Sequence, residues 1–358
     1  MSKMDKLKRL SEVLSDFADC GIITDPVNRR YFTGMKSSAG ILLVFPKESV
    51  FLIDFRYIEK ARKTVRNCEV VLEKGNVYDQ IQKILSSRGV KKVAVDSETC
   101  TVAELNKYKS LLNCEILSDE RFAVEIRKIR SVKSQDEIDK IIAAQRIAEN
   151  GFQHMLNFIK AGKTEKEIQL ELDYYMLSNG AEGLSFDTIA LSGKNTSLPH
   201  GVPSDKKVEN GEFVLMDFGA VVDGYHSDMT RTVCVGKPTE EMEKVYNIVL
   251  KAQLAALKEI KSNVTGKSID KIARDIITAE GYGENFGHSL GHGVGMEIHE
   301  DPVASPRRDD ILSENSIVTV EPGIYLEDTF GVRIEDFVIV KNDGCQNMTS
   351  APKNLITL

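Results

Sequence analysis

Residues 210–236, NGEFVLMDFGAVVDGYHSDMTRTVCVG, decide the fold of the second part of this chain. Apolar residues flank the Asp-Gly pair at 223–224, which is typical of a two-residue hairpin turn. The stretch therefore predicts a β-hairpin in which the numbers of facing residues add up to 447. Asp228 then faces Gly219, and Asp217 lies two residues away on the same face. The two carboxylates are expected to be diagonal neighbours, close enough to share a site.

This hairpin has a counterpart at 315–340, NSIVTVEPGIYLEDTFGVRIEDFVIV, which predicts a second strand pair with a longer connection. Two helices are expected before each segment, at 135–160, 161–180, 239–261 and 265–281. Ser134 and Glu137 form a predicted capping box at the start of the first helix. We therefore expect an α+β domain made of two helix-plus-sheet halves.

The second helix of each half follows a Gly-Lys-Thr/Ser triplet, and the isoleucines Ile168 and Ile272 recur at an offset of 104. This similarity indicates a weak internal duplication. Neither triplet is a phosphate-binding loop, because neither has the required glycine five residues earlier. Thr164 and Ser268 are instead predicted to be helix N-caps.

Residues 1–130 predict a separate α/β domain. Apolar runs bounded by turn residues predict strands at 20–24, 39–45, 49–55, 68–73, 91–96 and 114–117, with helices at the N-terminus, 77–89 and 101–113. The segment 28–34, NRRYFTG, is interpreted as a strand-to-loop connection. Net charge changes from +6 in residues 1–130 to −13 in the remainder, so we expect domains at 1–130 and 131–358.

Composition excludes several classes of protein. The chain is 42% hydrophobic and has no apolar run long enough to span a membrane. Its charged, amphipathic start lacks the apolar core of a signal peptide, so a cytoplasmic location is expected. Six scattered cysteines without a CxxC pair predict free thiols. The diffuse basic charge of the first domain and the acidity of the second argue against a nucleic-acid partner.

Four acidic residues lie in the apolar strand segments of the second domain, namely Asp217, Asp228, Glu321 and Glu335. A buried carboxylate must be paired, hydrogen-bonded or bound to a metal. Any one of them could cap a turn or pair with Arg231 or Arg333. Four such acids together with His292 suit two divalent cations, and oxygen-rich ligation with one nitrogen favours Mn, Co, Fe or Zn. Two metal ions can activate a water and polarise a carbonyl, which suits amide or ester cleavage.

The stretch 286–302, FGHSLGHGVGMEIHEDP, contains three of the six histidines: His288, His292 and His299. Its closely spaced glycines would let the backbone approach a ligand, so it predicts a metal or acid/base site. The other candidates have plainer interpretations. His226 and Tyr225 lie near the hairpin turn and are taken as structural, and His154 on the first long helix is taken as a surface or packing residue.

The ordered series Asp217, Asp228, His292, Glu321 and Glu335 resembles the metal ligands of the pita-bread (creatinase/methionine aminopeptidase fold) metallopeptidases, which include methionine aminopeptidase, aminopeptidase P and prolidase. The matching stretches are MDFGA, YHSDMTRT, GHGVGMEIHE, VTVEPG and GVRIED. The family fold has two pseudo-symmetric halves, in agreement with the duplication. NRRYFTG and the following SSAG are similar to a segment of the Xaa-Pro branch, in which Phe32 replaces a leucine.

The resemblance implies a role for each ligand. Asp217 would bind one metal ion, and Asp228 and Glu335 would bridge two. His292 and Glu321 would bind the second ion, and Glu321 would also act as the general base.

The resemblance also implies residues that face the substrate. His200, in LPHG, and His299 would contact the substrate or stabilise the tetrahedral intermediate. His288 would lie beside the pocket for proline, and Arg333 could hold Asp217 or Glu335 charged or reach the substrate.

The leading hypothesis is therefore a cytoplasmic Xaa-Pro aminopeptidase with two divalent ions, Mn first, acting on peptides with proline in second position. An Xaa-Pro dipeptidase shares every motif and is the alternative. Methionine aminopeptidase usually lacks the first domain, and creatinase-like amidinohydrolases and non-catalytic binding modules lack the full ligand set. Relatives are often homodimers, so a homodimer is expected.

Overall fold

The computed structural model describes residues 6–358, which divide into two compact units, one ending at Arg130 and the other spanning Ser131–Leu358. Among the described residues, no helix is both long and apolar enough to cross a membrane. All six cysteines are free thiols, as predicted.

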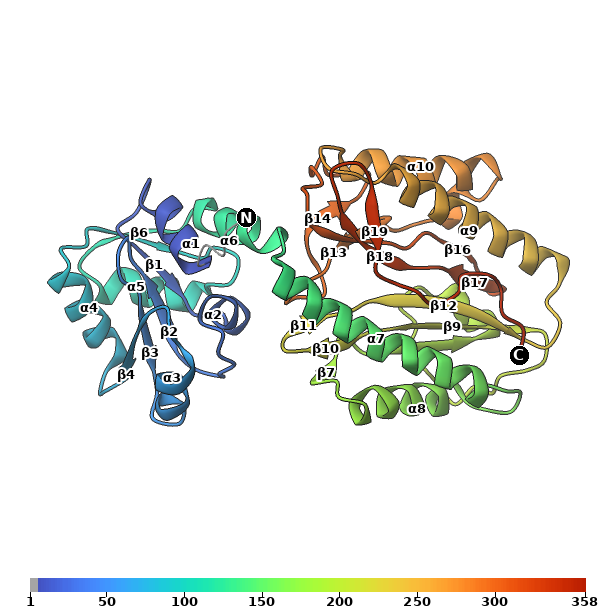
Figure 1. Cartoon of the computed structure of the whole chain (residues 1–358), viewed down its shortest axis with the longest axis horizontal. Coiled ribbons are helices and arrows are strands. Elements are labelled where there is room, and N and C mark those ends of the chain that lie inside the picture. Colours follow the sequence, from blue (N-terminus) through green and yellow to red (C-terminus); the bar gives the residue numbers. More distant parts are fainter. Residues whose placement is uncertain (1–5) are drawn as a thin grey trace. The chain divides into compact units, whose positions relative to one another are not determined.

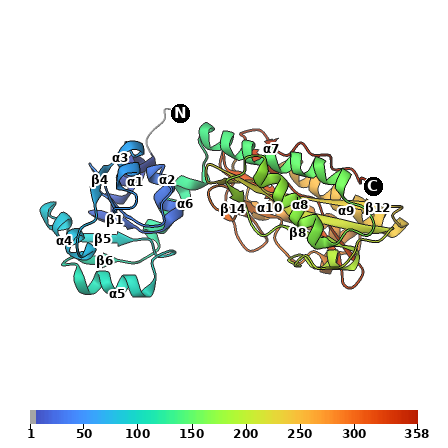
Figure 2. The same cartoon turned by 90° about the horizontal axis from the view of Figure 1, so that it is seen from below.

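The first unit is an α/β fold around a six-stranded sheet of order β4-β3-β2-β1-β5-β6. Its strands are β1 (Cys20–Ile23), β2 (Ile41–Val44), β3 (Val50–Ile53), β4 (Glu69–Leu72), β5 (Lys92–Val95) and β6 (Glu115–Leu117). Its helices are α1 (Lys6–Leu14), α2 (Pro26–Thr33), α3 (Ile58–Thr64), α4 (Val77–Ser87), α5 (Val102–Leu111) and α6 (Arg121–Ser131). Residues of α4 and α5 pack on the sheet in one buried apolar cluster. Figure 2 shows these two helices beside β5 and β6. All six predicted strands are confirmed.

The interpretation of residues 28–34 as a strand-to-loop connection was wrong, because they lie in α2 and its cap. Asp25 caps this helix by accepting a hydrogen bond from the Asn28 backbone N–H at 2.7 Å, and Pro26 occupies the first turn, where its missing N–H costs nothing. Gly34 ends the helix in the left-handed conformation. These signals outweigh the turn-like composition. The short helices α3 and α6 were not predicted.

The second unit places strands between two pairs of helices (Figure 1). The helices are α7 (Gln135–Phe158), α8 (Glu165–Ser178), α9 (Glu240–Glu259) and α10 (Gly266–Ala279). Short 3-10 turns are η1 (Gly193–Ser197) and η2 (Gly283–Asn285). One apolar cluster packs α7 and α8 on the strands, and a second does so for α9 and α10. In Figure 2, α7 and α8 cover the face of the unit turned to the reader.

The strands of this unit form four small sheets, of orders β11-β10-β7, β12-β9-β8, β14-β13-β15-β18-β19 and β16-β17. The first-half strands are β7 (Gly183–Leu184), β8 (Ile189–Ser192), β9 (Glu212–Phe218), β10 (Ala220–Val222), β11 (Tyr225–His226) and β12 (Met229–Val235). The second-half strands are β13 (Gly291–Gly293), β14 (Glu300–Ala304), β15 (Ile317–Val320), β16 (Gly323–Leu326), β17 (Phe330–Arg333), β18 (Asp336–Val340) and β19 (Cys345–Asn347).

The two halves of the second unit repeat one plan, which confirms the predicted fold class. Helices α8 and α10 have the same length, each follows an N-cap threonine, and each of these threonines pairs with a strand-like segment of its own half. The predicted N-cap Thr164 is confirmed, but Ser268 is wrong: Thr265 caps α10. The structural counterpart of Ile168 is therefore the buried Ile269, not Ile272.

Candidate metal centre

The first hairpin has the predicted register. Asp217 pairs with Thr230 in the β9–β12 ladder, and Val221 pairs with His226 in the β10–β11 ladder, so facing numbers add up to 447 throughout. Positive φ at both Asp223 and Gly224 closes the turn. The ladder is interrupted between these two sheets, and Asp228 lies in that interruption.

The second hairpin is built in the same way. Strand β15 pairs with β18 and, further along the chain, β16 pairs with β17, both in a register where facing numbers add up to 656. Glu321 and Glu335 lie opposite each other in the gap between the two ladders. The interruption of the first hairpin therefore carries Asp228, two residues from the paired Thr230 and Asp217, and that of the second carries Glu321 and Glu335.

His292 joins these acids from β13. Its Nε2 lies 3.3 Å from Glu321 Oε1 and 3.6 Å from Asp228 Oδ2. Ligand atoms of Asp228, His292 and Glu335 all lie within 4.8 Å of one another, the arrangement of a cation site. The His292 Nδ1 lies 3.1 Å from the Gly293 carbonyl, a contact that fixes the ring and leaves Nε2 facing the acids.

The glycines around His292 serve a different purpose from the predicted one. A Cβ at Gly291 would lie 2.0 Å from the Thr319 carbonyl oxygen, and one at Gly293 would lie 2.5 Å from the Asp301 carbonyl oxygen. These positions are glycine because the neighbouring strands approach too closely for any side chain. The glycines thus let β13 pack between its neighbours, which positions the His292 ring.

The buried carboxylates of the cluster repel one another, so some of them are protonated unless positive charge lies nearby. Burial raises the pKa of Asp228 well above its usual range, and the carboxylates of Asp217 and Glu321 raise it further. Burial likewise raises the pKa of Glu335 well above its usual range, with like-charge repulsion from Asp228. Burial raises the pKa of Glu321 to about 7 although Arg333 opposes this shift.

The residues present fit a divalent cation. Burial lowers the pKa of His292, so its imidazole is neutral, as ligation requires. Among the described residues, the buried Asp217 Oδ1 has no hydrogen-bond partner. An unpaired acceptor, a neutral imidazole and mutually repelling carboxylates are together stabilised by positive charge at their centre.

Arg333 supplies part of that charge. It is 3% exposed, and its Nη2 donates to Asp217 Oδ2. Its Nη1 donates to the Tyr325 hydroxyl at 2.8 Å, and that hydroxyl lies 2.9 Å from His288 Nε2. A continuous hydrogen-bonded path therefore joins His288 to the acid cluster. The sequence left open that the acids simply pair with Arg231 or Arg333. Asp217 does pair with Arg333, but Arg231 pairs with Asp336 and with none of the four acids.

The remaining predicted substrate residues surround the cluster. The His299 ring lies edge-on to the His292 ring, with centroids 4.3 Å apart. Burial, with a smaller contribution from His200, lowers the pKa of both His288 and His299 to about 4. His200 is exposed on the loop after η1 and lies near enough to interact with these two rings and with Glu321.

The other candidates have structural surroundings. His154 contacts Glu171 at 2.6 Å and stacks on Tyr175, between α7 and α8. The Tyr225 hydroxyl donates to Glu137, whose other carboxylate oxygen completes the capping box of α7. Burial lowers the pKa of His226, and the acids that oppose this shift belong to its own surroundings, not to the cluster.

Sequence reasoning missed three hydroxyl groups of this site. Two of them orient acids: Thr230 donates to Glu335 at 2.7 Å, and Thr319 donates to Glu321 at 3.0 Å. The third is that of Tyr325, which joins Arg333 to His288. The two threonines lie two residues from Asp228 and Glu321, so the alternation of side chains along a strand could have found them. Tyr325 carries no such local signal.

Comparison with known proteins gives matches along the whole chain. Residues 139–342 match the model of Metallopeptidase family M24, and residues 5–132 match the Creatinase/Prolidase N-terminal domain. The chain is 41% identical, over 99% of its length and 100% of the relative's, to a Bacillus subtilis protein described as uncharacterized peptidase YqhT. It is 37% identical, over 98% of its length and 99% of the relative's, to an Xaa-Pro dipeptidase of Pyrococcus horikoshii.

Solved structures are similar over the same extent. An Xaa-Pro dipeptidase from Bacillus anthracis has a TM-score of 0.96 at 40% identity and covers 99% of both chains. An X-Pro aminopeptidase from Thermotoga maritima has a TM-score of 0.91 at 39% identity, covering 99% of this chain and 100% of that one.

Proposed function

The chain belongs to metallopeptidase family M24, and on that premise we propose that it is a metal-dependent Xaa-Pro aminopeptidase, hydrolysing the bond between an N-terminal residue and proline. The chain is a hydrolase of Xaa-Pro bonds whose family uses divalent metal ions. The single observation that carries the proposal is the buried group of Asp228, His292 and Glu335, with Glu321 beside it, in which repelling acids surround a neutral imidazole.

The proposed centre holds two ions between Asp217, Asp228, His292, Glu321 and Glu335. Mn is the first choice, with Co, Zn or Fe as alternatives, because four of the five ligands are carboxylates and one is an imidazole. Bound ions of this kind supply Lewis acidity and lower the pKa of water.

Individual side chains of the site are proposed to act as the base, to contact the substrate and to hold a metal ligand ionised. Glu321, whose Oε1 accepts a hydrogen bond from Thr319 and lies beside His292, is proposed as the base that takes a proton from the attacking water and returns it to the leaving imide nitrogen. His299, neutral at pH 7, would exchange hydrogen bonds with the substrate instead of binding it by charge. Both ring nitrogens of His288 are already engaged, by the Ser289 carbonyl and the Tyr325 hydroxyl. His200 is proposed to contact the substrate, and Arg333 to hold Asp217 in its ionised form.

A dedicated site for proline follows from the substrate's chemistry. An Xaa-Pro bond has no N–H, and the ring fixes φ, so a site built for an ordinary peptide bond fits it poorly. The rings of Phe286, His288 and Tyr325 lie edge to face or tilted against one another, with centroids 5.0 and 5.5 Å apart. We propose that His288 borders the proline ring from this aromatic group.

The test compares rates on Xaa-Pro, Xaa-Pro-Yaa and Met-Ala-Yaa peptides with Mn. Cleavage of the tripeptide supports an aminopeptidase, and cleavage of the dipeptide alone would change the assignment to an Xaa-Pro dipeptidase. Cleavage of Met-Ala-Yaa alone would contradict both. The expected homodimer is a separate proposal, measured by light scattering on the full chain.

A further inference from the structure

The residues between β8 and Ser204 form a loop, residues 193–204, which carries His200. This loop begins with η1 and exposes two large apolar side chains, Leu198 at 54% and Val202 at 80%. Gly331 donates a backbone hydrogen bond to Thr196, which holds the middle of the loop. The outer part of the loop, around His200, thus has little packing of its own to fix its position.

Both ends of this loop are tied to one buried carboxylate, that of Glu165. Glu165 is the first residue of α8 and is 0% exposed. Its Oε1 accepts hydrogen bonds from the Ser192 N–H at 2.7 Å, the Ser192 hydroxyl at 3.2 Å and the Asn195 amide at 3.0 Å. Its Oε2 accepts from the Ser204 N–H at 3.0 Å and the Ser204 hydroxyl at 2.6 Å.

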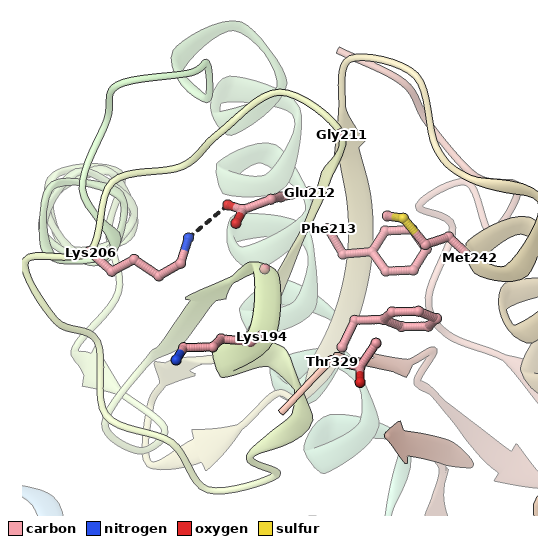
Figure 3. Close-up of a pocket in the computed structure, with 9 residues that line it drawn as sticks. Lys194, Lys206, Gly211, Glu212, Phe213, Met242 and Thr329 are labelled. Atoms are coloured by element: carbon pink, nitrogen blue, oxygen red, sulfur yellow. Dashed lines mark hydrogen bonds and ion pairs between the residues drawn. The ribbon is translucent and has the colours of Figure 1, made fainter. Parts of the chain in front are cut away.

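Backbone and lysine contacts complete the same junction. The Glu165 N–H donates to the Lys206 carbonyl, and the Lys166 N–H donates to the Ser204 carbonyl, each at 3.0 Å. The Lys206 ammonium lies 3.1 Å from the Ser192 hydroxyl. It also lies 2.7 Å from a Glu212 carboxylate oxygen (Figure 3).

A cavity of about 350 Å³ adjoins this junction and is bordered by Gly193, Lys194 and Lys206 (Figure 3). The start of the loop therefore has open space on one side. Its other side packs against β17 and β9, so packing and the hydrogen bonds to Glu165 together fix where the loop begins. The hydrogen bonds from Ser204 to the same carboxylate fix where it ends.

We propose that Glu165 is a positioning residue of the peptidase, which sets the place of His200 by fixing both ends of loop 193–204. The inference rests on the proposed function, since His200 matters only if it faces the substrate. The second half of the unit has no copy of this device, because the position equivalent to Glu165 is Gly266, where a Cβ would lie 2.1 Å from the Val303 carbonyl oxygen.

Only a carboxylate can satisfy this arrangement. Donors converge on both oxygens, and each oxygen faces a backbone N–H that cannot rotate away. Glutamine has one acceptor oxygen and one NH₂ group, so in Glu165→Gln one backbone N–H meets another donor. One end of the loop is then released. Helix α8 itself keeps its buried face of Ile168, Leu172 and Met176.

The test uses Glu165→Gln with Glu167→Gln as the matched control. Glu167 lies one residue beyond Lys166 on the same helix and closes the capping box with Thr164, away from the loop. With Mn and a proline-containing tripeptide, Glu165→Gln should lower kcat by roughly 10- to 100-fold, the scale of a misplaced catalytic contact. The Mn affinity should stay within about twofold of wild type, and Glu167→Gln should keep kcat within a similar margin.

A double-mutant cycle with His200→Ala separates positioning from general structure. If Glu165 acts through His200, adding Glu165→Gln to His200→Ala should cause no further loss. The inference would be overturned if the double variant lost kcat by the product of the two single losses. A weakened Mn affinity or an unchanged kcat in Glu165→Gln would also overturn it. Ser204→Ala, which removes one hydroxyl donor and keeps the carboxylate, should show a smaller loss of the same kind, and it serves if Glu165→Gln does not fold.

Limited trypsin digestion tests the loop without reference to activity. Lys194 is exposed within the loop, so release of an end should raise the cleavage rate there by about tenfold in Glu165→Gln but not in Glu167→Gln. Equal rates in both variants contradict the inference. If the wild-type protein cleaves no proline peptide, the proposed function fails, and digestion still decides whether Glu165 holds the loop.

Discussion

Asp336→Asn should destabilise the second unit more than any other single charge removal proposed in this protein. Asp336 is 0% exposed and follows Glu335 directly. Its Oδ1 receives Arg231 at 2.7 Å, and its Oδ2 receives Gln253 at 3.0 Å, with Asn347 and Lys353 each at 2.7 Å. One carboxylate therefore ties together β12, α9, β19 and the C-terminal segment.

The magnitude follows from what the substitution leaves behind. Arg231 is 1% exposed and would lose its only charged partner among the described residues. Breaking a buried ion pair costs about 3–5 kcal/mol. Arg231 keeps the carbonyls of Glu335 and Ala351 as acceptors, so the lower end, about 3 kcal/mol, applies. For a domain of this size the melting temperature should fall by roughly 6–12 °C.

The assay is calorimetry of the full chain, with Asp343→Asn as a control at an exposed site in the β18–β19 turn. The control should change stability by less than about 0.5 kcal/mol. Burial alone would raise the pKa of Asp336, but Arg231 and Lys353 outweigh it and lower the pKa below its usual range. The stabilisation is therefore complete above the unfolded pKa, about 4, and is lost as pH falls through the lower folded value.

Two results would refute this reasoning. One is a melting temperature for Asp336→Asn within about 2 °C of wild type at pH 7. The other is a difference between the two proteins that stays constant as the pH is lowered below 4. Either would mean that Arg231 is stabilised by the carbonyls alone.

Three further predictions concern the metal centre. Asp228→Ala should lower Mn affinity by more than about 100-fold, measured by calorimetric titration, and abolish peptidase activity. Its circular dichroism spectrum should be unchanged. Chelation should inactivate the wild-type protein, and added Mn or Co should restore its activity. Thr230→Val, which removes the hydrogen bond to Glu335, should weaken Mn binding by about 10- to 100-fold, and an unchanged affinity would exclude that role. Tyr325→Phe, which removes the hydroxyl that contacts His288, should raise KM for proline peptides by about tenfold while Mn affinity holds.

Local chemistry predicted most of the fold and the acidic part of the candidate site. The register of the first hairpin followed from one Asp-Gly turn, because side chains alternate strictly along paired strands. Asp217 and Glu321 were evident as charges in apolar strands, which burial permits only with a partner. The capping box of Ser134 and Glu137 was equally local.

What sequence reasoning missed depends on contacts between distant segments. Tyr325 lies on β16, and its hydroxyl joins Arg333 on the paired strand to His288 in a separate segment, a contact that no spacing encodes. Glu165 gave only a helix-start signal, although its partners lie 27 and 39 residues away. Ser268 was a plausible cap by composition, but the bridge from Thr265 to the opposing segment sets the helix start earlier.

In each hairpin the two ladders on either side of the gap keep the same register. The number of residues between the gap and the hairpin turn therefore decides which way the acids point. One residue inserted into β10 or β11 would turn Asp228 to the opposite face of its strand and leave Asp217 in place. An insertion at the tip, between Asp223 and Gly224, would lengthen only the loop. This tip is the position in the first hairpin where a reporter peptide or a probe can be added without altering the spacing of the acids.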